Sequence, residues 1–192
     1  LLKTAYNKRL QLLKDLGYFQ GKSISTIYKR DLLQLTGEIR TTIATGDTDE
    51  NSWKAISVCA SIMKLSYAIE LLESQDFGAT HSYLSAIFKD ANSTKAAQDL
   101  TLDLHIKEGF EVLSHYIKEG VVHPKRIKLV EIISKIFEKQ PGSKIIVFNQ
   151  YRETAQAIVE ELEQFKEFRP TIFVGKAKKG EMKMSQKSKK KF

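Results

Sequence analysis

The chain has 192 residues, of which 42% are hydrophobic and 28% charged, with 3 prolines and 10 glycines. This composition argues for a globular chain of long helices and against a turn-rich β protein. The net charge of +8 is local, because residues 176–192 hold eight lysines against Glu181 and the first 175 residues carry only +1. Such a basic tail can pair with phosphates, and a solvated chain end fits it equally.

The sequence has no stretch near the roughly 20 uninterrupted apolar residues that span a bilayer. Its start also lacks the pattern of a secretion signal. We therefore expect a cytoplasmic location and no membrane partner. The single Cys59 lies in a helix-like run, which predicts a buried, inert thiol. Leu1 in place of methionine, and a lysine run that stops at Phe192, favour a piece of a longer polypeptide.

Five helices are predicted over the first 120 residues from apolar positions at helical spacing. They cover about 1–18, 24–43, 53–73, 80–90 and 94–120. The candidate caps are polar: Ser23 or Ser25, the loop GDTDEN at 46–51, and Ser93 or Thr94. The third helix is apolar on more than one side, so we expect it at the centre of the helical domain.

The pattern changes after His123. Pro124 suits the first turn of a helix that continues to Phe137, and the run KIIVF after it is typical of a strand buried in a parallel sheet. A further helix, RETAQAIVEELEQF, and a second short run, TIFVG, complete an αβαβ order. The predicted fold is mainly α, with a helical domain over 1–122 and a partial α/β domain over 123–192. A sheet of two strands leaves an open edge, so we expect self-association or local disorder there.

Two motif-like clusters fail on spacing. Residues 21–23 (GKS) imitate the end of a phosphate-binding P-loop, but Leu16 stands where that motif needs glycine and no strand precedes it. Residues 47–51 begin like a calcium loop, but Ser52 and Val58 replace the required glycine and glutamate. The four histidines have no cysteine or carboxylate at ligand spacing, so no metal site is predicted.

The polar residues after KIIVF are the more informative signal. Asn149, Tyr151 and Arg152 follow the predicted strand just as a helix begins, and ligands of open α/β sheets meet the carboxyl ends of strands. An amide, an aromatic ring, a guanidinium and helix N–H groups suit a phosphate backbone and a stacked base. An ordinary solvated loop fits this signal alone. The second strand is followed by lysines and by SQK at 185–187, which favours one nucleic-acid-binding edge near Tyr151 and Gln186.

The run KIIVFNQYRETAQAIVEEL resembles motif IV of the second motor domain in archaeal Hef helicases and their eukaryotic relatives of the Fanconi anaemia M type, in helicase superfamily 2. The run FVGKAKKGEMKMSQKSKKKF resembles the stretch that follows it, although its glycine-rich loop is shorter and Met184 replaces a leucine. Upstream, MKLSYAIELLESQ and STKAAQ resemble parts of that family's thumb-like helical insertion. The His123–Pro124 pair resembles the junction between insertion and motor domain.

This resemblance implies an archaeal, ATP-dependent DNA helicase that acts on forked or branched DNA in repair or replication restart, with ATP and Mg²⁺ as cofactors of the whole enzyme. The chain would contribute DNA binding to that enzyme through a RecA-like domain and the insertion. The family's motifs place strand contacts at Asn149, Tyr151, Arg152, Thr154, Gly175, Lys176, Ser185, Gln186 and Lys187. The P-loop, the DEAH-like motif and the arginine-finger motif are missing from the sequence, so we expect no catalytic residue, no cofactor and no ATP hydrolysis by this chain alone.

Two other functions fit the residues. A helical module that binds a protein partner would show an exposed apolar helix face. The equivalent part of an RNA helicase of the innate-sensor type would carry a helical insertion at the same place, and competition between RNA and DNA would separate it from the DNA helicase.

Overall fold

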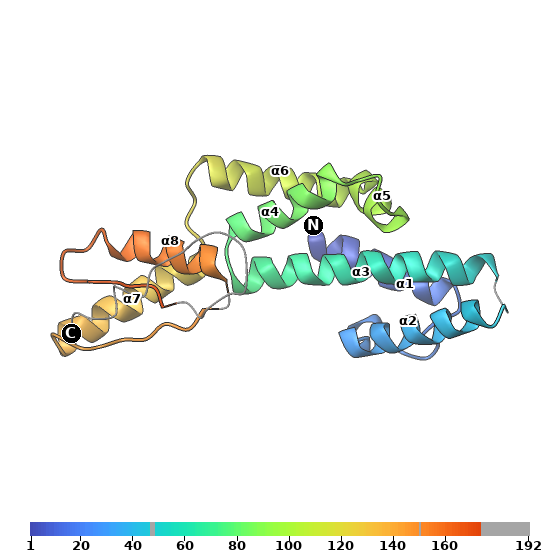
Figure 1. The fold of residues 1–192 in the computed structure, drawn as a ribbon, viewed down its shortest axis with the longest axis horizontal. Helices are drawn as coiled ribbons and strands as arrows, with labels where there is room; N and C mark the ends of the chain where they lie inside the picture. The colour runs from blue at the N-terminus through green and yellow to red at the C-terminus, as the bar shows by residue number, and fades with distance from the viewer. Residues whose placement is uncertain (47–48, 150, 174–192) are drawn as a thin grey trace. The chain divides into compact units, whose positions relative to one another are not determined.

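The computed structural model describes residues 1–46, 49–149 and 151–173. They fall into two compact units, Leu1–Val147 and a second that begins at Phe148. The helices of the first unit are α1 (Leu2–Asp15), a short 3-10 turn η1 (Ile24–Thr26), α2 (Lys29–Ala44), α3 (Glu50–Ser74), α4 (Phe77–Lys89), α5 (Lys95–Leu102), α6 (Leu104–Lys118) and α7 (Pro124–Lys139). The second unit contains α8 (Arg152–Leu162). The chain is mainly helical, as predicted (Figure 1).

Helix α3 is the centre of the first unit. It packs against α1, α2, α4 and α5, which confirms the predicted central position of the third helix. By length and composition alone α3 could cross a membrane, but Ile62 and Leu65 in its middle are fully buried in the bundle. Its apolar character is therefore explained by the neighbouring helices that surround it.

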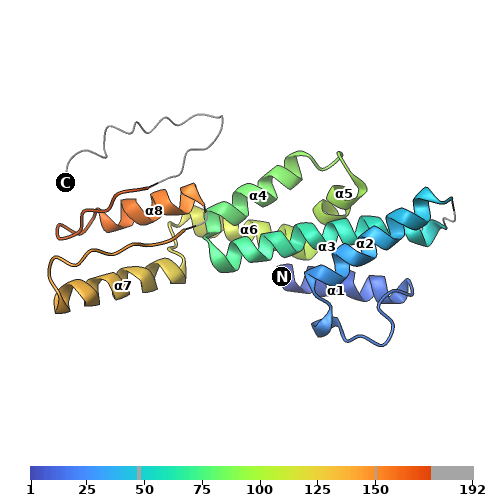
Figure 2. The same ribbon diagram turned by 60° about the horizontal axis from the view of Figure 1, so that its bottom comes forward.

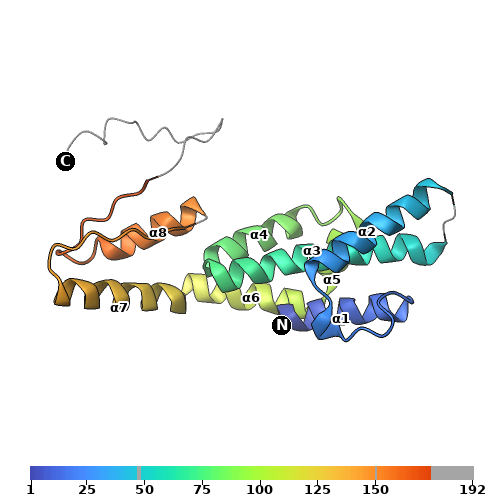
Figure 3. The same cartoon turned by 90° about the horizontal axis from the view of Figure 1, so that it is seen from below.

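Two apolar clusters share α3. The cluster at the first half of α3 contains residues of α1 and α2, and the cluster at its second half contains residues of α1, α4, α5 and α6 (Figures 2 and 3). Cys59 is fully buried in the first cluster, as predicted, and burial raises the pKa of its thiol. Each fully buried leucine of these clusters, such as Leu32 or Leu84, contributes about 1.5 to 3 kcal/mol by leaving water.

The predicted caps of two helices are confirmed. The Asp49 carboxylate accepts a hydrogen bond of 2.7 Å from the Ser52 N–H at the start of α3. The Thr94 hydroxyl accepts one of 3.1 Å from the Ala97 N–H at the start of α5. These side chains satisfy amides that the helix itself leaves unpaired. The acidic loop before α3 is thus explained by capping.

The predicted helix over 94–120 is two helices, because the chain turns at Asp103. Arg9 of α1 is 5% exposed, and its Nη1 donates to the Asp103 carboxylate over 2.8 Å. The other carboxylate oxygen of Asp103 accepts from the His105 N–H at 2.9 Å and caps α6. Burial raises the pKa of Asp103, but the bonds and charge of Arg9 and the His105 N–H outweigh it and lower that pKa overall. Helical spacing continues through this corner, so the sequence pattern does not reveal it.

The second helix also begins later than predicted. The region of Ser23 and Ser25 forms the 3-10 turn, and α2 starts only at Lys29. The Asp31 carboxylate accepts a hydrogen bond of 2.8 Å from the Tyr28 N–H, which fixes the helix start there. Asp31 is the third helical residue, where an acidic side chain reaches back to the cap.

The first predicted strand, KIIVF at 144–148, is not formed, and the described part of the second run, residues 171–173, is not in a strand: residues 1–46, 49–149 and 151–173 contain no strand. Ile146, Phe148 and Phe173 are 78%, 93% and 78% exposed. A strand has its hydrogen bonds on neighbouring strands, whereas a helix makes its own. The runs at 144–148 and 171–173 lack that pairing in the described part of the chain. The predicted domain boundary at 122/123 stays a prediction, since the compact units divide at 147/148.

Candidate nucleic-acid interface

The start of α8 is organised by a local turn. The Asn149 side-chain oxygen accepts a hydrogen bond of 3.0 Å from the Tyr151 N–H, and the Tyr151 carbonyl accepts one of 3.1 Å from the Ala155 N–H. Tyr151 is extended, at φ −115° and ψ 136°, so the helix begins at Arg152. An asparagine that folds back on the backbone two residues later is a common way to turn a loop into a helix. The turn places Asn149, Tyr151 and Arg152 together at one helix end.

Only some of the predicted contact residues can be located. Asn149 and Arg152 are exposed and Tyr151 is half-buried. Thr154 is 4% exposed, so its hydroxyl is not open to a strand in this arrangement. The remaining predicted contacts lie outside the described residues: Gly175, Lys176, Ser185, Gln186 and Lys187. Their role, and the shared edge between the loops near Tyr151 and Gln186, stay predictions.

Charge is uneven along α8. Arg152 and Glu153 open the helix with opposite formal charges, whereas its last turn and the residue after it carry Glu160, Glu161 and Glu163. The helix dipole adds partial positive charge at the start and partial negative charge at the end. A phosphate is therefore attracted to the turn at 149–152 and repelled from the other end of the helix.

A second basic surface lies at the start of α2 and was missed in the sequence. Tyr28 is 63% exposed, and the two cations that follow it, Lys29 and Arg30, are exposed as well. We call these three residues the Tyr28 corner. An exposed ring beside two cations can stack on a base while the cations meet phosphates. The sequence signal for this surface is the run YKR at 28–30, followed by Asp31 as the third helical residue. It was missed because the predicted helix over 24–43 included Tyr28.

The motif-like GKS segment has a structural role. Lys22 pairs with Asp31 at 3.3 Å and lies over the Phe19 ring at 5.9 Å. The pKa of Asp31 is lowered, first by the Tyr28 N–H and then by Lys22. The segment lies between two helices, whereas a P-loop joins a strand to a helix, so its surroundings differ from those of an ATP site. Among the residues that the structure describes, no cluster of three or more metal-ligating side chains occurs.

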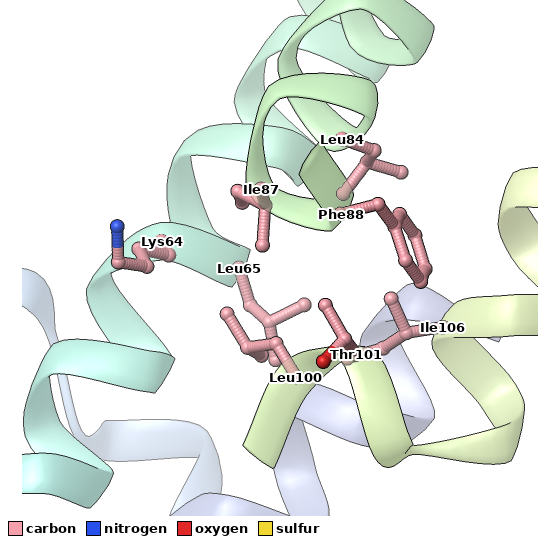
Figure 4. A pocket seen from close by; sticks show the side chains of 8 residues that line it. All are labelled: Lys64, Leu65, Leu84, Ile87, Phe88, Leu100, Thr101 and Ile106. Carbon is pink, nitrogen blue, oxygen red and sulfur yellow. The ribbon is translucent and has the colours of Figure 1, made fainter. Parts of the chain in front are cut away.

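The interior of the bundle offers no ligand cavity at the place where four of its helices meet. Side chains from α3, α4, α5 and α6 converge there, as Figure 4 shows, among them Leu65, Leu84 and Phe88. The space between them has no room for a water molecule. A shallow cleft of about 220 Å³ between α1 and α3 is lined in part by Lys3, whose ammonium pairs with Glu73 at 2.6 Å. The candidate interface is therefore on the surface.

A comparison with known protein families matches the helical part of the chain. A family model described as "Putative ATP-dependent RNA helicase, helical bundle" matches residues 1–120, which contain α1 to α6. The chain belongs to this helicase helical-bundle family. A curated relative in Methanocaldococcus jannaschii, named "Putative ATP-dependent RNA helicase", is 33% identical over 187 residues. That match covers 97% of this chain but 22% of the relative.

A solved structure extends the likeness beyond the helical bundle. The helicase domain of Hef from Pyrococcus furiosus matches with a TM-score of 0.77 and 33% identity, over 93% of this chain and 37% of that one. The predicted resemblance to Hef helicases is thereby confirmed. The chain corresponds to part of a helicase, since it spans about a fifth of the curated relative and just over a third of the Hef domain.

Proposed function

We propose that this helicase helical-bundle protein supplies nucleic-acid contacts to an ATP-dependent superfamily 2 helicase that acts on forked or branched DNA during repair or replication restart. The observation that carries the proposal is the match to the Hef helicase domain across 93% of the chain. Its helical part would be an insertion, and the residues after His123 would begin the second RecA-like motor domain.

Two surfaces support nucleic-acid binding. The turn at 149–152 combines an amide, a half-buried ring and an exposed guanidinium at a helix N-terminus. The Tyr28 corner combines an exposed ring with two exposed cations. Both arrangements suit sugar and phosphate and carry no pattern for reading a base sequence. We therefore expect binding that depends on DNA structure more than on sequence.

The whole helicase would use ATP and Mg²⁺ in the cytoplasm of an archaeal cell. In phosphoryl transfer a P-loop holds the phosphates, a carboxylate holds the metal ion and an arginine stabilises the transferred charge. This sequence lacks those motifs. The expected contribution of the chain is therefore to grip DNA while other parts of the enzyme hydrolyse ATP.

A salt titration on forked DNA tests the proposal. Each phosphate that a lysine or arginine neutralises should lower the slope of log affinity against log salt by about 0.9. We expect a linear fall with several such contacts for this chain. A flat plot at measurable affinity would overturn phosphate contact and the proposed function with it.

An RNA substrate is the second candidate, because the family description and the curated relative both carry the name RNA helicase. The two surfaces above would serve either nucleic acid. Competition between forked DNA and RNA of the same branched design decides the matter. DNA that displaces RNA at equal concentration supports the proposal, and the reverse order supports the RNA helicase.

Protein binding is favoured by a different observation. Leu102 and Leu104, on either side of Asp103 at the α5–α6 corner, are 73% and 70% exposed. Contiguous exposed apolar patches mark interaction surfaces on soluble proteins, and these two leucines are the candidate centre of such a patch. Indifference of the chain to duplex, forked and single-stranded DNA would favour a protein-interaction module over the helicase role.

A further inference from the structure

The side chain of His123 joins the ends of two helices. The residue is 8% exposed, and its Nε2 lies 3.0 Å from the Leu72 carbonyl oxygen in the last turn of α3. Its Nδ1 accepts a hydrogen bond of 3.2 Å from the Lys125 N–H in the first turn of α7. The ring also packs on Phe77 at the start of α4, with 4.9 Å between centroids. One imidazole therefore holds three helices at one point.

The partners of the ring fix its protons. An amide N–H can only donate and a carbonyl can only accept, so Nδ1 must present a lone pair to Lys125 and Nε2 must carry the proton that Leu72 accepts. This describes a neutral imidazole in one tautomer. A second proton on Nδ1 would set two donors against each other and remove the cap of α7.

The neighbouring sequence explains why a histidine fits here. Pro124 restricts the residue before it to extended backbone, and His123 has φ −64° and ψ 135°. Proline has no N–H, so Lys125 carries the first amide of α7 that needs a partner. The Leu72 carbonyl is among the last four of α3, which the helix leaves without an internal donor. Each helix has one unpaired group, and a single ring satisfies both.

We infer that His123 is a positioning residue that fixes the entry of α7 in its neutral form and releases it on protonation. This goes beyond the proposed function and does not depend on nucleic-acid binding. Helix α7 is the first helix of the predicted motor part, so His123 fixes the point at which the chain passes from the helical bundle into that part. Mild acid would loosen this link while both core clusters stay buried.

Titratable groups lie on each of the elements that meet at the ring. The elements that meet there carry Glu73 on α3, Asp76 before α4, His115 and Tyr116 on α6, and Lys125 and Arg126 on α7. Both carboxylates have other partners: Glu73 pairs with Lys3 at 2.6 Å, and Asp76 accepts from the Ala79 N–H at 2.8 Å.

Nitrogen NMR on the full chain tests the contacts of His123 with Leu72 and Lys125 directly. At about pH 8 we expect the His123 ring to show a protonated Nε2 and an unprotonated Nδ1, the tautomer that these partners require. Exchange of the Lys125 amide, corrected for its intrinsic rate, should become about fivefold faster at about pH 5.5, the change expected when one helix cap is lost. A ring protonated on Nδ1 at high pH would overturn the inference.

Two variants distinguish protonation of His123 from other effects of acid on the chain. His123→Asn keeps a capping oxygen for Lys125 but has no titrating ring, so its Lys125 amide should show the same protection at both pH values. His115→Asn removes an exposed histidine on α6 and should behave like the parent chain. Equal protection in the parent chain at the two pH values, or the same acid effect in His123→Asn, would show that protonation of His123 does not release α7.

Discussion

Residues 1–120 and residues 141–173 differ in how far their apolar side chains are buried and their backbone is hydrogen-bonded. The first region packs six helices together, with α3 at the centre, and caps several of their starts with its own side chains. The second contains two β-branched runs whose largest side chains are almost fully exposed. The bundle makes its hydrogen bonds and its core from its own residues. The runs at 144–148 and 171–173 have the composition of buried strands, but among the described residues no neighbouring strand covers them, which teaches that composition alone does not build a sheet.

The largest expected effect is on the free energy of unfolding, which should fall when a buried side chain of the first region is removed and change little when an exposed one of the second is removed. Leu65→Ala removes a side chain that is 1% exposed at the meeting point of four helices, and we expect a loss of about 3 to 4 kcal/mol in the free energy of unfolding. Phe148→Ala removes a larger side chain that is 93% exposed, so it should change that free energy little. Urea denaturation followed by circular dichroism measures both. A comparable loss in Phe148→Ala would mean that the run at 144–148 is covered in solution.

The buried ion pair of the bundle should come next. Arg9→Met leaves the Asp103 carboxylate, whose side chain is 7% exposed, without its cation, and we expect a loss of about 3 kcal/mol at neutral pH. The pKa of Asp103 is lowered in the folded chain, so its stabilisation is present above the pKa of an unfolded aspartate and is lost as pH falls through the lower folded value. The difference between parent and variant should therefore shrink as acid is added.

A matched variant checks the part that burial plays in that effect. Lys3→Met breaks the Lys3–Glu73 pair, whose side chains are 72% and 56% exposed, and should cost much less than Arg9→Met. Equal losses in the two variants would mean that the Arg9 pair is no more important than a surface pair.

A smaller effect is expected on binding at the start of α8. Arg152→Gln should reduce the salt slope of binding to forked DNA by about one and weaken binding evenly across DNA sequences. Lys166→Gln changes an exposed cation beyond the other end of α8, near the glutamates, and serves as the control. Fluorescence anisotropy over a salt series measures both. An unchanged slope in Arg152→Gln would exclude that guanidinium as a phosphate contact.

The smallest effect concerns the surface of α7. Glu131 bridges Lys135 at 2.6 Å and Lys128 at 2.9 Å, and the bond from Lys135, followed by that from Lys128, lowers its pKa to about 2. All three side chains are exposed, so Glu131→Gln should leave the melting temperature almost unchanged. NMR titration of the carboxyl group checks the pKa. A midpoint near its ordinary 4.5 would show that the bridge does not persist in solution.

The sequence predicted those elements that depend on local spacing. Apolar periodicity located the long third helix and its central place, and the acidic loop before it was correctly interpreted as a cap at Asp49. The corner at Asp103 could not be found this way, because it depends on Arg9, 94 residues earlier in the chain. The start of α2 was missed for a related reason: the bond from Tyr28 to Asp31 competes with a helical pattern that continues on both sides.

The candidate site was predicted only in part. The motif after KIIVF gave the helix start and its polar turn, and the structure brings Asn149 and Tyr151 together there. Accessibility was not predictable: Thr154, the third residue of α8, is buried. The capping role of His123 needed coordinates as well, since its two partners are 2 and 51 residues away.

Because Cys59 is buried, its reaction rate reports local opening of the bundle. It is the single sulfhydryl in the sequence, it is fully shielded, and its raised pKa keeps it from reacting as a thiolate. A disulfide reagent can therefore modify the chain only when the contacts between α2 and α3 separate. The rate of that modification in the unaltered protein measures how often the first half of the bundle opens locally. Comparing the rate with and without DNA would show whether a bound strand reduces this opening.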